Sequence, residues 1–228
     1  MNPVSEPTRL YRFVERRWMD AFFSDGSLRL NTTYDLRDTL LYSGDRGDGQ
    51  EGQVRRVRVV DDLLLTGARP EPVVDRAVQV ADGGAARITG CVFHETVTAP
   101  DRFVFSMSDG FSPELLRHFR DDVGADACYE ITDTQFFSEI SEVARGWATW
   151  FGCFGVTYIG DVVLYPSPEI DIAPDVLKRR RFVWQREVRS MWNGEAKPLV
   201  PQNIMVPEAR RHARPFARIA GDRIEMLR

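Results

Sequence analysis

Residues 181–192 read RFVWQREVRSMW, and in this apolar stretch Gln185, Glu187 and Arg189 occupy every second position. Alternate side chains of a strand point to the same face, so a strand would line these three residues up together. Such a polar row belongs either on a solvent-exposed face or along a functional cleft. A helix is the alternative, because apolar residues also recur here at loosely helical spacing: Leu177, Val183, Trp184, Val188 and Met191.

The chain can bury a sizeable core, since 43% of its 228 residues are hydrophobic and 11% are aromatic. Neither a repeat nor a linker-like stretch divides it. We therefore expect one domain over residues 1–228. Its core lies at about residues 8–192, and residues 193–228 form a basic C-terminal extension.

The charge balance gives no reason to expect general binding to nucleic acids or membranes, because 30 basic residues face 34 acidic ones. Cys91, Cys128 and Cys153 are widely spaced, which suits a reducing compartment and gives no zinc signature. The N-terminus lacks the apolar core of a signal peptide, and no apolar run has the length of a membrane span. The expected location is the cytoplasm, with no metal and no membrane partner.

Periodicity predicts both strands and helices. Ser112, Pro113 and Gly124 are typical start and stop residues for one of the helices. A Gly- and Asp-rich stretch, residues 34–53, predicts an irregular loop whose part 43–53 is the most mobile internal segment. Strands are expected at 8–14, 27–32, 54–60, 76–83, 86–93, 102–108, 127–132, 153–159 and 162–167, and helices at 15–26, 112–124, 133–147 and 173–182. The fold class is α+β, with a mixed, mostly antiparallel β core and flanking helices.

Three segments resemble, in the same order, an uncharacterised family of bacterial and phage proteins. The chain has LYRF at residues 10–13, FVFSMSDGFSPELLRHF at residues 103–119 and KRRRFVWQREVR at residues 178–189. The family has a LYKYR-like first strand, a Phe-Ser strand before a Leu-rich helix, and a late Trp-x-x-Glu-x-Arg element. The resemblance covers roughly residues 9–192.

That family is in turn similar to the ADP-ribosyltransferase fold of the Arg–Ser–Glu type. Arg12 matches the Arg of the first strand, Ser106-Met107-Ser108 the middle motif, and Gln185-Arg186-Glu187 the late Gln-x-Glu. Met107 departs from the usual Thr. The resemblance implies NAD as substrate, with a protein or nucleic acid as the unidentified acceptor.

The chemistry implied by this resemblance assigns a role to each residue. Cleavage of the nicotinamide–ribose bond develops positive charge on the ribose, which the Glu187 carboxylate would stabilise. Ser106 would orient Glu187, Gln185 would contact the acceptor, and Arg12 would bind NAD through its guanidinium. The other candidates for contact with NAD are Tyr11, Asn31, Tyr34 and Ser108.

Each assignment has a structural alternative. Arg12 is otherwise a surface cation beside Glu15, and Ser106 and Ser108 mark the outward face of a strand. The function predicted from the resemblance is an NAD-dependent mono-ADP-ribosyltransferase-like protein, or an NAD glycohydrolase, of a toxin or phage-defence system. The alternative is a non-catalytic nucleotide- or protein-binding module on the same fold. The basic runs 178–182 and 208–218 are further candidate contact surfaces.

Overall fold

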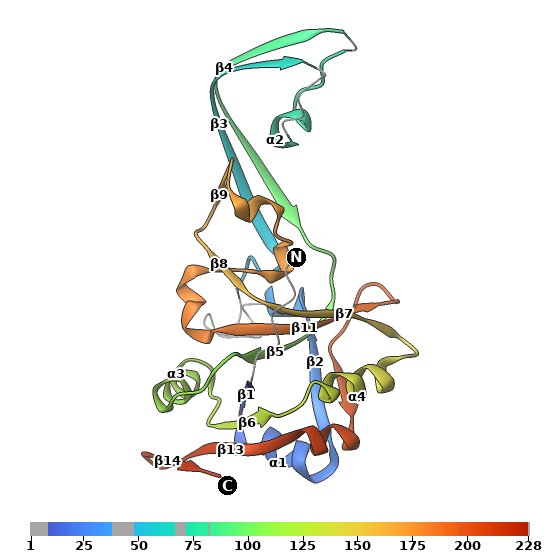
Figure 1. Ribbon diagram of the computed structural model, residues 1–228, viewed down its shortest axis with the longest axis vertical. Coiled ribbons are helices and arrows are strands. Elements are labelled where there is room, and N and C mark those ends of the chain that lie inside the picture. Colours follow the sequence, from blue (N-terminus) through green and yellow to red (C-terminus); the bar gives the residue numbers. More distant parts are fainter. Residues whose placement is uncertain (1–8, 38–47, 67–71, 82, 228) are drawn as a thin grey trace.

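A branched antiparallel sheet forms the body of the protein, and a long two-stranded arm projects from it (Figure 1). The computed structural model describes residues 9–37, 48–66, 72–81 and 83–227. The strands of the body sheet are β1 (Leu10–Val14), β2 (Ser27–Thr32), β5 (Phe103–Ser108), β6 (Ala127–Ile131), β7 (Ala148–Gly155), β11 (Glu187–Gly194), β12 (Gln202–Met205), β13 (Ala213–Ala220) and β14 (Arg223–Met226).

The body sheet forks at its central strand, β5. Along one edge, β5 pairs over its whole length with β11, which in turn pairs with β7. Along the other edge, β1 meets β5 only at Ser108, and β2 meets it only at Phe103 and Val104. The β1 branch continues through β6 and β13 to β14, and the β2 branch ends at β12.

Helices cover both faces of the body sheet. On one face, α1 (Arg16–Asp25) and α4 (Gln135–Ala144) bury Phe22 and Phe136 in the main core, together with Phe105 of β5. On the other face, α3 (Pro113–Val123) buries Leu116 in a smaller core against β1. Successive residues of β1 and β5 therefore pack into different cores, as the period of a strand requires.

The arm is a hairpin of β3 (Gln53–Thr66) and β4 (Ala85–Thr98), and Figure 1 shows it extending well beyond the body. At its base β9 (Val163–Leu164) pairs with β3. Near its tip, α2 (Pro72–Asp75) covers a small core formed around Val60, Leu65 and Val74. The arm thus has apolar packing of its own.

Short elements connect the arm base to β11. They are the strands β8 (Thr157–Ile159) and β10 (Leu177–Arg179), which pair in parallel, and the 3₁₀ helices η2 (Pro168–Asp171), η3 (Pro174–Val176) and η4 (Arg180–Gln185). The predicted helix over 173–182 is therefore wrong. Two 3₁₀ helices and a short strand replace it, and Lys178, in the middle, is buried. Two further 3₁₀ helices lie elsewhere: η1 (Asp35–Arg37) follows β2, and η5 (Pro207–His212) joins β12 to β13.

The expected α+β class with a mostly antiparallel sheet is confirmed. The C-terminal segment is not an extension, since β12, β13 and β14 complete the body sheet. The expected strand over 76–83 is wrong, because residues 76–81 follow α2 as turn and irregular structure. Within the expected loop 34–53, residues 38–47 lie outside the described residues. In the described part of the chain, none of the helices has the length and apolar character to cross a membrane.

We expect Ser112→Ala to lower the free energy of unfolding by about 1 kcal/mol. The Ser112 hydroxyl caps α3 by accepting a hydrogen bond of 3.0 Å from the Leu115 amide, which the helix itself cannot satisfy. Urea unfolding followed by circular dichroism measures the loss. Ser112→Asp keeps the acceptor and serves as the control, so an equal loss in both variants would contradict this role.

Candidate functional site

Three of the predicted residues form a row across neighbouring strands. Ser108 of β5 lies opposite Glu187, the first residue of β11, and also opposite Tyr11 of β1. Residues directly opposite each other in a sheet share a face. The next pair along β5 and β11 is Ser106 and Arg189, on the same face. Glu187 was predicted on a strand next to the Ser106 strand, with its carboxylate facing a cleft. The strand placement is confirmed, whereas the carboxylate is buried.

Arg12 lies on the opposite face of the sheet. It follows Tyr11 on β1, and its guanidinium lies 4.6 Å from the ring centre of Phe105, a residue of the main core. It also donates a hydrogen bond to the backbone carbonyl of Ser106. Ser106 sits at the fork, between the β5 residues that pair with β1 and with β2, and the guanidinium supplies a donor there. The predicted convergence of Arg12 with Glu187 is therefore wrong.

Asn31 and Tyr34 make their contacts elsewhere. The Asn31 side chain accepts a hydrogen bond of 2.9 Å from Arg29. The Tyr34 hydroxyl donates to the Ala99 carbonyl at 2.9 Å, and the Arg37 guanidinium lies 3.8 Å from the centre of the Tyr34 ring. The structure therefore leaves these two residues outside the row at Glu187.

The Glu187 carboxylate belongs to a buried network, which we call the charge cluster: Glu51, Asp175, Lys178, Gln185, Glu187 and Arg189. Lys178 Nζ lies 2.6 Å from Glu187 Oε2 and 2.7 Å from Gln185 Oε1. Arg189 Nε lies 2.8 Å from Glu187 Oε1. Within the described residues, Ser106 is not among the partners of this carboxylate.

Arg189 extends the charge cluster toward the arm. Its side chain is completely buried, donates to the Glu51 carboxylate, and lies 2.6 Å from the Asp175 carbonyl oxygen. Glu51 stands in the turn just before β3. One guanidinium therefore connects β11 to the base of the arm.

A reversal of the chain places Gln185 over Glu187. The 3₁₀ helix η4 ends at Arg186, which has a left-handed backbone with φ of 48°, and β11 starts at the next residue. Trp184 anchors η4 by stacking on His118 of α3, with ring centres 3.9 Å apart. Ser108 Oγ donates to the Gln185 carbonyl at 2.6 Å. Gln185 thus reaches the Glu187 face from a helical turn, whereas the sequence analysis considered one strand or one helix for both residues.

Electrostatics keep both members of the Glu187–Arg189 pair ionised. Burial alone would raise the pKa of the Glu187 carboxyl, but the charges of Arg189 and Lys178 and their hydrogen bonds hold it well below its usual range. Burial would lower the pKa of Arg189, and the carboxylates of Glu187 and Glu51 outweigh that and raise it. The Glu187 negative charge is therefore neutralised within the protein.

Sequence reasoning missed several members of the charge cluster. Lys178 was assigned to a basic run considered as a contact surface, and Glu51 to a mobile loop. Arg189 was noticed only as part of the polar row. A charged residue inside an otherwise apolar run was the available signal for Arg189, whereas nothing in the local pattern around Glu51 indicates burial.

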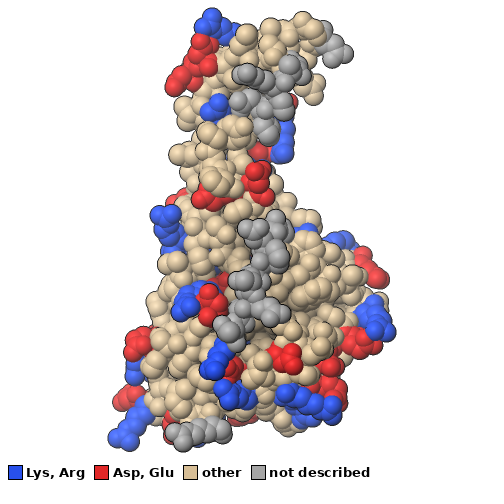
Figure 2. Space-filling view, viewed as in Figure 1, with Lys and Arg blue, Asp and Glu red and all other residues tan. Residues whose placement is uncertain are grey.

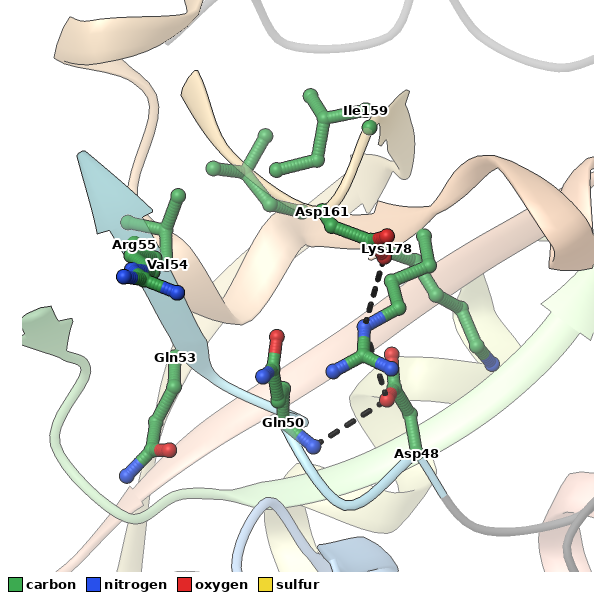
Figure 3. Close-up of a pocket in the computed structure, with 11 residues that line it drawn as sticks. Asp48, Gln50, Gln53, Val54, Arg55, Ile159, Asp161 and Lys178 are labelled. Atoms are coloured by element: carbon green, nitrogen blue, oxygen red, sulfur yellow. Dashed lines mark hydrogen bonds and ion pairs between the residues drawn. The ribbon is translucent and has the colours of Figure 1, made fainter. Parts of the chain in front are cut away.

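A recess opens beside the charge cluster, at the base of the arm (Figure 3). It is shallow and open to solvent, and its cavity volume is only about 10 Å³. Eleven residues line it: Asp48, Gln50, Gln53, Val54, Arg55, Ile159, Gly160, Asp161, Leu177, Lys178 and Arg179. Arginine, lysine, aspartate and glutamine side chains line it, so it suits a polar ligand. Among the described residues, no group of three or more His, Cys, Asp or Glu side chains is arranged to hold a metal ion.

Comparisons with known proteins do not add a relative. No family model, no curated protein and no solved structure matches the chain. Function must therefore be argued from the geometry of the charge cluster and the recess.

We expect Arg12→Ala to lower the free energy of unfolding by about 1–2 kcal/mol, because it leaves the part-buried Ser106 carbonyl without its side-chain donor. Denaturant unfolding measures this. Arg17→Ala is the matched control. Arg17 is exposed, and its contacts with Glu15 and the Trp18 ring lie at the surface, so its effect should stay within about 0.5 kcal/mol. Similar losses in the two variants would argue against a role for Arg12 at the fork.

Acid should weaken the fold partly through Glu187. Its pKa is depressed in the folded state, so the stability it contributes is complete above the unfolded pKa of about 4.3 and is lost as pH falls toward the folded pKa. In Glu187→Gln the free energy of unfolding should therefore fall less steeply below about pH 4.3, by up to about 1.4 kcal/mol per pH unit. Urea titrations at several acidic pH values test this, with the surface variant Glu208→Gln as control. Identical slopes in wild type and Glu187→Gln would refute the assignment.

Proposed function

We propose that the chain is a non-catalytic binding module that takes a small ligand at the recess. The observation that carries this proposal is the state of Glu187, whose carboxylate is buried and held between Lys178 and Arg189. A carboxylate that already faces two cations has little capacity to stabilise a further positive charge developing on a ribose. The group that the transferase chemistry needs is therefore committed to the fold.

The position of Arg12 supports the same proposal. A transferase of the resembled type needs its Arg, Ser and Glu around one NAD molecule. Arg12 instead packs on Phe105, on the face of the sheet opposite Glu187. A ligand held by Glu187 would be out of reach of the Arg12 guanidinium. A protein that binds a ligand without cleaving it does not need Arg12 or Glu187 to be free. The recess provides polar groups for such binding.

One observation favours the transferase or glycohydrolase as a second candidate. β1, β5 and β11 are adjacent strands, and they carry Arg12, Ser106 and Glu187. The acceptor in that case would be a protein or a nucleic acid, and the setting a toxin or phage-defence system in the cytoplasm. This candidate requires Lys178 or Arg189 to release Glu187 when NAD binds.

A broad nucleic-acid surface has less support. In the basic run 208–218, Arg211 pairs with Glu208 at 2.6 Å and Arg218 with Glu225 at 2.7 Å, and Arg210 donates to backbone carbonyls. Figure 2 shows blue and red side chains interspersed over the lower body on the visible face. Such pairing leaves little net positive field there to attract phosphates.

Incubation with NAD labelled in nicotinamide separates the two candidates. We expect wild type to release no nicotinamide above the protein-free control, with or without a mixture of proteins and nucleic acids as acceptor. If wild type releases nicotinamide, and the rate of release falls about 10²–10³-fold in Glu187→Gln, the protein is an enzyme and the binding-module proposal is wrong. Glu225→Gln, a change on β14, is the matched control, and circular dichroism verifies that each variant is folded.

A further inference from the structure

We propose that the recess binds the phosphoryl group of a phosphate monoester, with Arg179 as the principal contact. This inference rests on the proposed function and specifies the ligand class of the same site. Arg179 is the last residue of β10, and it lines the recess next to Lys178. Lys178 is already committed to Glu187, so Arg179 is the cation with which a ligand would interact.

The hydrogen-bonding capacity of Arg179 is not used up by the protein. Its Nε is buried and has no hydrogen-bond partner among the described residues. The nearest acids are Asp48 at 3.6 Å and Asp161 at 3.8 Å, both beyond hydrogen-bond length. A buried donor without an acceptor is unfavourable. The Arg179 side chain as a whole is 23% exposed, so the guanidinium can turn toward an anion in the recess and remove that penalty.

The carboxylates of Asp48 and Asp161 differ in how easily an anion could displace them. Asp48 is buried, accepts the Gln50 amide at 3.2 Å, and is tied to its turn. Asp161 has a side chain that is 88% exposed, so it can swing into water at little cost. Figure 3 shows both carboxylates on the side of the recess away from Arg55. An entering anion would therefore displace Asp161 and leave Asp48 in place.

A second cation favours a doubly charged ligand over a carboxylate. Arg55 is exposed and lines the same recess from β3, and Figure 3 shows it on the side away from Asp48. Arginine binds phosphate oxygens through two parallel N–H groups, and two arginines match the two charges of a phosphate monoester. Arg181, whose guanidinium lies 3.9 Å from Asp48, offsets part of the remaining acidic charge.

The rest of the lining suits the organic part of such a ligand. Gln50 and Gln53 offer amide donors and acceptors, and Figure 3 shows Gln50 between Arg55 and Asp48. Val54, Ile159 and Leu177 are buried apolar residues that also line the recess. Amides beside an apolar wall can contact a sugar or a base, whereas free phosphate uses only the cations.

Isothermal titration with adenosine monophosphate, ribose 5-phosphate, inorganic phosphate and adenosine tests the proposal on the full chain. Wild type should bind both monoesters, each more tightly than inorganic phosphate or adenosine. Arg179→Ala should weaken monoester binding at least about tenfold, which corresponds to about 1.4 kcal/mol. Arg179→Lys keeps the charge but loses the fork and should fall in between. Asp161→Asn should tighten binding about two- to fivefold, because it removes the competing carboxylate.

Arg211→Ala, an exposed arginine of η5, is the matched control and should bind as wild type does. Thermal unfolding of each variant verifies that it is folded. Failure of all four probes to bind overturns the proposal, as does monoester binding unaffected by either Arg179 variant. If inorganic phosphate binds as tightly as the monoesters, the recess is a site for free phosphate and the monoester proposal is wrong. Nicotinamide release from NAD tests whether the protein is an enzyme, whereas these titrations test only the class of ligand. The monoester proposal can therefore fail while the binding-module proposal stands.

Discussion

The buried contact of Arg189 with Glu187 and Glu51 is the interaction on which the rest of the structure depends. Removing a charge from water is costly, and the cost is recovered only when partners and hydrogen bonds are complete. Here one fully buried guanidinium meets two carboxylates and a backbone carbonyl. Because Glu51 precedes β3 directly, these contacts fix the base of the arm on the body sheet. Loss of one partner would leave an uncompensated buried charge, a change of about 3–5 kcal/mol in comparable cases.

The fork in the body sheet explains a second use of arginine. A sheet that splits leaves backbone groups between its branches, and those groups need partners from side chains. Arg12 supplies one donor and covers an aromatic ring of the core. The same residue type at the same strand position could serve a ligand in another protein. Sequence alone does not separate these uses, because the difference lies in which face of β1 the side chain occupies.

Much of the fold could be predicted from local pattern. The residues Ser112, Pro113 and Gly124 marked α3 because capping chemistry is local. β5 was predicted as a strand, whereas the stretch that forms β11 was left open between strand and helix. The long-range contacts were not. Glu51 is 138 residues from Arg189, and a turn rich in Gly and Asp carries no signal for a buried carboxylate. Lys178 looked solvated for the same reason, since only the tertiary fold encloses it.

The separate packing of the arm tip has a consequence for how the protein opens. The residues of the tip core, Val60, Leu65 and Val74, are not shared with the main core around Phe22 and Phe105. Regions that share no apolar contacts can lose structure independently, each with its own free energy of opening. The tip is the smaller unit and has only a few buried side chains. Its backbone amides should therefore exchange with solvent in local openings that leave the body sheet closed, so the chain behaves as two cooperative units within one domain.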